Sequence, residues 1–212
     1  MNEKKLVVFD LDGTLNKTEL YAVPAHRKAL AELNISDKSD ELIISTFGAR
    51  GIDCVHLLIN TTDEKEAYDY FKKVSQYENE FITQFAGEFE GTSAMLDTLR
   101  KDGYHIAVCS NASERYIRMV LSALNIIDKI DYIQPLLLDM IKDDTLKFLL
   151  EREMPDKAVM VGDRVFDKNA ARANAIPFIG CMYGFENSEV ADADIAVKEP
   201  SEINDAVKKL IG

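Results

Sequence analysis

The sequence predicts an α/β protein: a parallel-sheet core with a helical cap domain inserted after the first strand. Short apolar runs typical of buried strands alternate with segments of helical periodicity over residues 91–212, a pattern that favours a mostly parallel sheet. Residues 16–90 show helical periodicity without a convincing strand, and they far exceed the roughly 12 residues that a crossover connection needs. We therefore assign residues 1–15 and 91–212 to the core and residues 16–90 to the cap.

Six apolar runs are the candidate strands. The first occupies residues 6–10 and is followed by a turn containing Gly13 and Thr14, residue types that suit a turn. The others lie at residues 106–110, 132–134, 159–162, 178–180 and 195–197. Because helical segments separate most of these runs, we expect parallel strands whose carboxyl ends share one edge of the sheet.

Helices are expected between the strands and throughout the cap. In the core, apolar stripes predict helices over residues 94–101 and 143–154, and Ser201 is expected to cap a final helix. In the cap, apolar residues at helical spacing predict four helices, around residues 25–33, 42–44, 55–59 and 67–85. The expected hinges of the cap are residues 16–18 and 87–91.

The composition argues against several classes of partner. A net charge of −12 without any basic stripe disfavours binding to nucleic acid or to an anionic membrane surface, and no apolar stretch is long enough to span a bilayer. Cys54, Cys109 and Cys181 are widely spaced, which favours reduced thiols in a cytoplasmic protein. Nothing in the sequence indicates an oligomer, so a monomer is the default expectation.

Two aspartates, Asp10 and Asp12, lie where the first apolar run ends. Adjacent carboxylates repel each other unless a cation neutralises them or one of them is protonated. The pair therefore indicates a divalent-metal site, or a nucleophile with an acid/base partner beside it. Taken alone, the pair is also explained by simple turn chemistry at a strand end.

Polar residues also follow three other elements of the predicted core. They are Ser110 and Asn111 after the second strand, Lys142 just ahead of the helix that begins near residue 143, and Asp163 and Asp167 after the strand at residues 159–162. If the strands are parallel, all these side chains meet Asp10 at one edge of the sheet, where open α/β sheets bind ligands.

The chain resembles the haloacid dehalogenase superfamily of phosphatases in four motifs. They are D-L-D-G-T at residues 10–14, S-N at 110–111, Lys142, and G-D-R-V-F-D at 162–167. The resemblance covers nearly the whole chain and points to the subgroup with a helical cap after the first motif, which contains phosphoglycolate phosphatases, β-phosphoglucomutases and related pyrophosphatases and nucleotidases. It implies a Rossmann-like core, a magnesium ion and an aspartyl-phosphate intermediate. Lys17 departs from an acidic residue common in relatives, so no single relative's substrate is carried over.

The resemblance also implies a role for each aspartate of the motifs. Asp10 would be the nucleophile and a metal ligand. Asp12 would be the acid/base, with its backbone carbonyl on the metal, and Asp163 would supply the third protein oxygen to magnesium. Asp167 would orient Lys142 or a metal-bound water.

The remaining motif residues are expected to hold the substrate. Thr14, Ser110 and Asn111 would bind it through the phosphoryl group, while Lys142 would place an ammonium against the nucleophile and the phosphate. Ser110 has an alternative role as a helix N-cap, since a helix follows it. Lys147 is the alternative to Lys142, whose acidic neighbours are also typical of a solvated helix face.

One further pattern is rejected. Cys109 and Arg115 have the spacing of a cysteine-dependent phosphatase loop, but the residues between them include no glycine. Cys109 follows apolar Val108 in a predicted strand, so we expect it to be a small core residue.

Four cap residues are candidates for substrate contact. Arg50, in a Gly-flanked loop at residues 47–51, is expected either to clamp a second anionic group or to be an exposed surface arginine. Tyr21, His26 and Arg27 lie near the first hinge and are candidates for the entrance, although His26 is expected on a helix surface.

The sequence therefore predicts a magnesium-dependent phosphohydrolase that acts on a small phosphorylated metabolite, such as pyrophosphate, a nucleoside monophosphate, phosphoglycolate or a sugar phosphate. A dehalogenase is disfavoured because its chemistry has no use for Asp12 as acid/base or for a metal at Asp163. A phosphomutase of the same family and a non-catalytic domain that binds a phosphorylated ligand remain as alternatives.

Overall fold

A six-stranded parallel sheet forms the centre of the computed structural model, which describes residues 3–212. Its strand order is β3-β2-β1-β4-β5-β6. The strands are β1 (Lys5–Phe9), β2 (His105–Cys109), β3 (Tyr132–Gln134), β4 (Lys157–Gly162), β5 (Phe178–Cys181) and β6 (Ile195–Val197). All six predicted strands are confirmed to within two residues at either end. The α/β class is confirmed with them.

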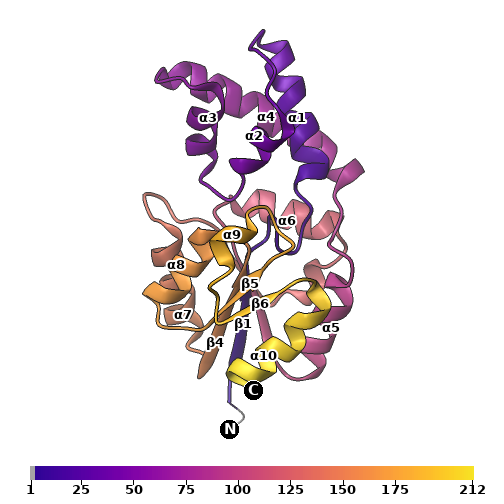
Figure 1. Ribbon diagram of the computed structural model, residues 1–212, viewed down its shortest axis with the longest axis vertical. Helices are drawn as coiled ribbons and strands as arrows, with labels where there is room; N and C mark the ends of the chain where they lie inside the picture. Colours follow the sequence, from indigo (N-terminus) through magenta and orange to yellow (C-terminus); the bar gives the residue numbers. More distant parts are fainter. Residues whose placement is uncertain (1–2) are drawn as a thin grey trace.

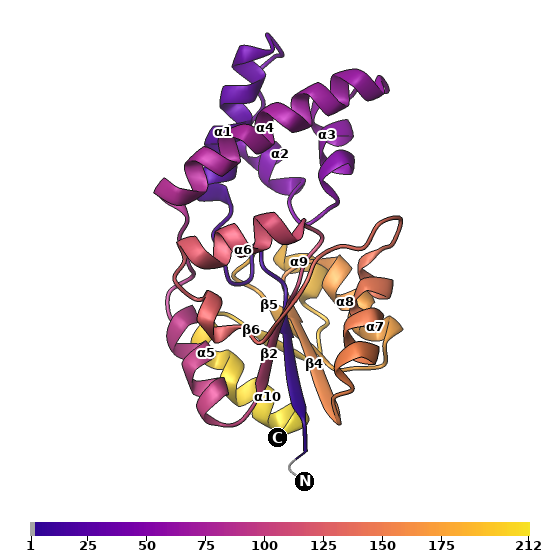
Figure 2. The ribbon, with the colours of Figure 1, turned by 180° about the vertical axis from the view of Figure 1, so that it is seen from behind.

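Helices cover both faces of the sheet, as Figures 1 and 2 show. One face carries α5 (Thr92–Lys101), α6 (Glu114–Ala123) and α10 (Ile203–Ile211); the other carries α7 (Lys142–Glu153), α8 (Val165–Ala173) and the short α9 (Asn187–Val190). Along β1, Val7 and Phe9 pack into the first layer, and Leu6 and Val8 pack into the second. A strand buried on both faces reads as a continuous apolar run, which is why β1 was recognisable.

Four helices lie between β1 and α5 in the sequence and sit over the carboxyl end of the sheet (Figure 1). They are α1 (Glu19–Glu32), α2 (Asp40–Ser45), α3 (Gly51–Ile59) and α4 (Glu64–Phe85). Ser39 caps α2 and Asp63 caps α4 by accepting hydrogen bonds from backbone N–H groups of the first turn. The four expected cap helices are therefore all present, and α1 packs against α4.

The two connections between the cap and the core run side by side. The backbone N–H of Lys17 donates to the carbonyl of Gly87 (2.8 Å), and Asn16 forms an isolated bridge with Glu88. These residues fall in the two segments that we expected to be hinges. Both segments therefore leave the core at one place, as a lid on a double hinge requires.

The last helix begins differently from the sequence expectation. Ser201 was expected to be its N-cap, but Ser201 lies within a short 3-10 turn, Pro200–Glu202, and Glu202 precedes the first residue of α10. The Ser201 hydroxyl donates to the carboxylate of Glu199. Pro200 fixes the backbone for this turn, so the N-cap prediction was wrong.

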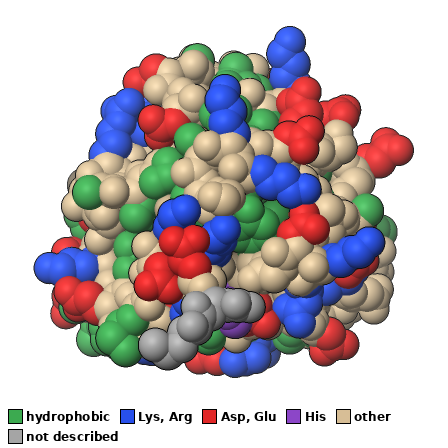
Figure 3. All heavy atoms as spheres, turned by 90° about the horizontal axis from the view of Figure 1, so that it is seen from below, with side chains coloured by type: hydrophobic (Ala, Val, Ile, Leu, Met, Phe, Trp, Pro, Cys, Tyr) green, Lys and Arg blue, Asp and Glu red, His purple; other side chains and the backbone are tan. Residues whose placement is uncertain are grey.

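The end of the core opposite the cap carries interspersed acidic and basic side chains (Figure 3). Lys4 pairs with Glu153 at 3.3 Å and Lys157 with Glu3 at 3.4 Å. Acidic and basic side chains therefore alternate over the described part of this face. In residues 3–212, every helix is too short or too polar to cross a membrane.

Candidate active site

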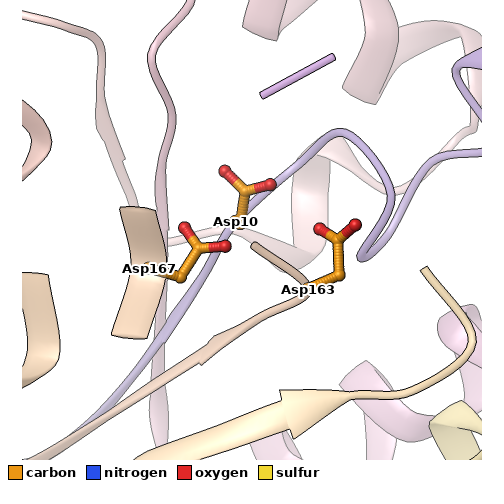
Figure 4. Close-up of side chains that lie close together, drawn as sticks. All are labelled: Asp10, Asp163 and Asp167. Carbon is orange, nitrogen blue, oxygen red and sulfur yellow. The ribbon is translucent and has the colours of Figure 1, made fainter. Parts of the chain in front are cut away.

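Three buried carboxylates meet at the carboxyl edge of the sheet. Asp10 follows β1, Asp163 follows β4, and Asp167 lies in the first turn of α8; each offers an oxygen within 4.8 Å of the others (Figure 4). Their exposed fractions are 4%, 0% and 1%. The register explains the meeting, because Phe9 at the end of β1 pairs with Val161 of β4.

Two glycines let the chain approach these carboxylates. Gly13 has a φ of +85°, and a Cβ there would lie 2.3 Å from an Asp163 oxygen. A Cβ on Gly162 would lie 2.3 Å from Cγ of Asp167. Both positions therefore require glycine, one for its backbone conformation and both for space.

Lys142 supplies the cation of this cluster. Its ammonium contacts Oδ1 of Asp10 and lies 2.5 Å from Oδ1 of Asp167. Lys142 is the first residue of α7, not a residue ahead of the helix as expected. The alternative, Lys147, is exposed and lies 3.9 Å from Glu151, so the geometry favours Lys142.

Burial makes Asp10 and Asp163 difficult to ionise. It raises the pKa of Asp10 well above its ordinary value; Lys142 opposes this, while Asp167 and Asp163 add to it. Burial and the neighbouring Asp167 raise the pKa of Asp163 to about 7. For Lys142, burial lowers the pKa, but Asp10 and Asp167 outweigh it and the pKa is raised. The single positive charge of Lys142 therefore faces three acidic side chains. The cluster can accept a further positive charge.

The donor set fits a hard divalent cation. Asp167 is engaged by Lys142 and by the backbone N–H of Arg164 at 3.0 Å. Asp163 accepts from the Thr14 hydroxyl at 3.1 Å and from the Phe185 N–H at 2.9 Å, and each carboxylate oxygen keeps a second lone pair. Oxygens of Asp10 and Asp163 are the ligands that magnesium prefers.

Asp12 lies apart from this cluster, toward the cap. Its Oδ1 accepts three hydrogen bonds: from Thr18 at 2.6 Å, Tyr116 at 2.9 Å and Asn16 at 3.1 Å. Burial raises its pKa, although these donors oppose the rise. Its carboxyl group is therefore held apart from the three clustered carboxylates by its own set of hydrogen bonds.

The predicted phosphate-binding residues divide into two groups. Ser110 is buried and lines the cavity described below, where its Oγ accepts from the Ala112 N–H at 3.2 Å. Asn111 also lines the cavity and donates from its amide to the Gly48 carbonyl at 2.8 Å. Thr14 is fully buried and its hydroxyl donates to Asp163, so it lies beside the acidic cluster and is not among the residues that line the cavity. The N-cap of α6 is Ser113, not Ser110, so the alternative role for Ser110 was wrong.

A cavity of about 240 Å³ lies between the core and the cap. Asp10, Asp12, Ser110 and Asn111 line it from the core. The cap contributes Thr18, His26, Thr46, Phe47, Gly48, Ala49, Gly51, Cys54, Val55, Phe71, Val74, Ser75 and Glu78, and α6 and the loop before it contribute Ala112, Ser113 and Tyr116. Its volume suits a small ligand.

The cap loop at residues 46–50, which overlaps the predicted Gly-flanked loop at 47–51, reaches the core through its backbone. Arg164 donates to the Phe47 carbonyl, and Asn111 donates to that of Gly48. The ring of Phe47 packs edge-on against Phe185, with centroids 5.2 Å apart. Arg50 faces solvent and pairs with Asp53 at 2.7 Å, so the structure does not bring its guanidinium into the cavity.

The other three cap candidates occupy different places. Tyr21 is fully buried, with its hydroxyl 2.5 Å from that of Tyr116. His26 was expected on a helix surface but is buried, lines the cavity and lies 2.8 Å from the Tyr70 hydroxyl. Arg27 is exposed and pairs with Asp37 and Asp40, which places it outside the entrance.

Sequence reasoning missed three residues of the site. Tyr116 bonds Asp12, Arg164 holds the cap loop, and Glu78 faces the cavity from α4. The sequence spacing could have identified Glu78, because it lies seven residues after Phe71 and therefore on the same helical face. A carboxylate continuing an apolar stripe indicates a polar function there.

Cys109 is a core residue, as expected. It is fully buried in β2, and burial raises the pKa of its thiol to about 12. A thiol of this kind is protonated at neutral pH and is a poor nucleophile.

Comparison with known proteins places the chain in a family. The family model described as haloacid dehalogenase-like hydrolase matches residues 7–181. A phosphoglycolate phosphatase of Haemophilus influenzae is 27% identical over 207 residues, covering 85% of this chain and 87% of its own. One of Thiobacillus denitrificans is 27% identical over 212 residues, covering 93% and 92%. A crystal structure of a predicted phosphatase from Clostridium acetobutylicum has the same fold, with a TM-score of 0.88 at 24% identity over 99% of this chain and 100% of its own. The chain belongs to the haloacid dehalogenase-like hydrolases.

Proposed function

We propose that this protein is a magnesium-dependent phosphohydrolase that acts on a small phosphorylated metabolite through an aspartyl-phosphate. The observation that carries the proposal is the position of Asp10, which lines the cavity between cap and core while in contact with Lys142 and beside Asp163. The phosphoglycolate phosphatases among the relatives support a small phosphate ester as substrate.

Asp10 would act as the nucleophile. Its carboxylate oxygen attacks phosphorus, the bond to the leaving oxygen breaks, and the phosphoryl group is transferred to Asp10. Lys142 opposes the burial that raises the pKa of Asp10, and it faces the charge that spreads over the phosphoryl oxygens. The Ser110 hydroxyl and the Asn111 backbone N–H would bind those oxygens.

Asp12 would move the proton. Its Oδ1 is held by Thr18, Tyr116 and Asn16, which fixes the orientation of the carboxyl group. A raised pKa favours the protonated form, which donates to the leaving oxygen as the ester bond breaks. The resulting carboxylate then takes a proton from the water that hydrolyses the aspartyl-phosphate.

A magnesium ion held by Asp10, Asp163 and the backbone carbonyl of Asp12 would neutralise the repulsion between nucleophile and phosphate. Asp167 would position Lys142, and Thr14 would position Asp163. We also propose that residues 16–90 move as a cap domain on their double hinge, excluding bulk water when closed. The three free cysteines support a cytoplasmic location, and we retain a monomer as the default.

The test is phosphate release from a panel of phosphate esters and pyrophosphate, with magnesium and with EDTA, for the wild type and Asp10→Asn. We expect metal-dependent release that the variant reduces at least about 1,000-fold, because nucleophilic catalysis is lost. Asp205→Asn, on an exposed position of α10, is the matched control and should retain full activity.

The outcomes separate the alternatives. Turnover that requires a bisphosphate primer would identify a phosphomutase. Binding of magnesium and phosphate without turnover of any compound would identify a binding domain. Equal release with EDTA, or with Asp10→Asn, would contradict the proposed mechanism.

A further inference from the structure

Glu78 projects from α4 into the cavity above the acidic cluster. Phe71, Val74, Ser75 and Glu78 all line the cavity and follow the i, i+3, i+4, i+7 spacing of one helical face. Glu78 is half-buried and forms no ion pair or hydrogen bond with another side chain in residues 3–212. It is thus an acid presented to the ligand by the cap.

The cap offers no cation to balance it. Among the described residues that line the cavity, none is a lysine or an arginine. Arg50 is paired with Asp53 on the surface, and Arg164 is engaged by Glu189 and by the Phe47 carbonyl. Among the described residues, the part of the cavity that receives the leaving group therefore offers an acid and no basic side chain, so an anionic leaving group would find no cationic partner there.

Aromatic rings and neutral donors make up much of the remaining wall. Phe47, Phe71 and Tyr116 line the cavity together with His26. Burial lowers the pKa of His26 to about 4, so its ring is neutral at pH 7. Aromatic faces beside a carboxylate are the surroundings in which proteins bind organic ammonium groups.

We propose that the substrate is a small phosphate monoester whose leaving group carries an amine, bound as ammonium by Glu78 between the aromatic rings of the cap. This inference rests on the proposed phosphohydrolase function and narrows its substrate class. The phosphoryl group lies at Asp10 and Ser110, and the ammonium lies at the opposite wall formed by α4. A carboxylate-bearing ester such as phosphoglycolate is correspondingly disfavoured.

The electrostatics of the cavity support this assignment. Burial, followed by the charge of Asp12, raises the pKa of Glu78 to about 8. Burial raises the pKa values of the neighbouring Tyr21, Cys54, Tyr70 and Tyr116, and Glu78 adds to each rise. None of these groups is positively charged. A bound ammonium would supply the missing charge and stabilise the ionised form of Glu78.

The test uses three esters of similar size: 2-aminoethyl phosphate, 2-hydroxyethyl phosphate and phosphoglycolate. Acetyl phosphate serves as a reference that lacks the groups under test. We expect wild-type kcat/KM to fall in that order, with about a 10- to 100-fold preference for the amine over the alcohol, the size of one charged hydrogen bond. Glu78→Gln should remove the preference by lowering turnover of the amine and raising that of phosphoglycolate, each expressed relative to the turnover of acetyl phosphate by the same variant.

Glu80→Gln is the matched control, because Glu80 lies on the same helix but is exposed; it should leave the order of esters unchanged. A wild-type preference for phosphoglycolate, or an equal loss for all three esters in Glu78→Gln, would overturn the inference. If acetyl phosphate is not hydrolysed either, the phosphohydrolase proposal fails separately. The affinity of the three esters, measured by calorimetry, then still tests the inference. Tighter binding of the amine supports it if Glu78→Gln abolishes the difference in affinity. Equal binding of the three esters, or no binding, overturns it.

Discussion

His26 shows how a single buried side chain ties the stability of the cap to pH. Its ring is enclosed between α1 and α4, 2.8 Å from the Tyr70 hydroxyl, and burial lowers its pKa from 6.5 to about 4. The unfolded chain therefore takes up a proton between these values while the folded chain does not. The contribution of neutral His26 to the stability of the fold is therefore fully present above pH 6.5 and is lost as the pH falls toward 4.

We expect this histidine to reduce the free energy of unfolding by about 2 kcal/mol between pH 7 and pH 5. His26→Gln keeps a hydrogen-bonding side chain but does not titrate, so its pH dependence should be smaller by that amount. Urea unfolding of both proteins at the two pH values measures the difference. An identical pH dependence would show that His26 is not kept neutral by burial.

The site residues that could be predicted from the sequence are those whose position follows from the order of the strands in a parallel sheet. Asp10 and Asp163 follow buried strands, so their meeting could be predicted from the parallel topology. Glu78 and His26 lie on cap helices, and the face that turns toward the cavity depends on how α1 packs against α4. Arg50 illustrates the same limit, since its loop reaches the core while its own side chain pairs outward with Asp53.

At the scale of elements, the loop at residues 46–50 holds the cap against the core in addition to the two hinge segments. The guanidinium of Arg164, at the start of α8, donates to the carbonyl of Phe47 and pairs with Glu189 at 2.9 Å. A hydrogen bond to a charged donor is worth about 1.5–3 kcal/mol. Its removal should therefore open the loop at residues 46–50 about 10-fold or more often.

We expect Arg164→Met to accelerate amide hydrogen exchange in this loop and to raise KM more than it lowers kcat. Methionine retains an unbranched stem of similar length, so packing against Gly48 is largely kept. Arg50→Met is the matched control in the same loop, because its ion pair with Asp53 is exposed and such pairs are worth little. Unchanged amide exchange in Arg164→Met would contradict the role of Arg164 in holding the loop. A raised KM in Arg50→Met would instead support the hypothesis that Arg50 clamps the substrate.

Periodicity predicted which elements exist better than it predicted where they begin. All six strands and the four cap helices were expected, since buried runs and apolar stripes are determined by the core. The start of α10 was wrong because Pro200 shifts the first turn to a 3-10 helix, and the start of α7 was wrong by one residue at Lys142. The first residue of a helix depends on the local turn before it, which cannot be predicted from the hydrophobic pattern.

At the scale of the whole molecule, the acidic cluster brings together carboxyl groups from two distant segments of the core, where burial and mutual repulsion disfavour their ionised forms. Asp10 comes from the N-terminal strand, and Asp163 and Asp167 come from the segment around β4 and α8. The folded state raises the pKa of Asp163 from 3.8 to about 7, so it keeps a proton that the unfolded chain releases. The contribution of Asp163 to stability is therefore present below pH 3.8 and is lost as the pH rises through 7.

Metal-free Asp163→Asn should consequently be more stable than the wild type at pH 8, by about 2–4 kcal/mol, and similar to it near pH 4. The asparagine can accept from the Phe185 N–H and donate to Thr14, so both hydrogen bonds survive the change. Magnesium should reverse the order by stabilising only the wild type, by about 2.7 kcal/mol at a concentration 100 times its Kd. Urea unfolding at pH 8 with EDTA and with magnesium measures both effects. Equal stabilisation of the two proteins by magnesium, or a less stable metal-free variant, would show that the repulsion between these carboxylates is not what the metal relieves.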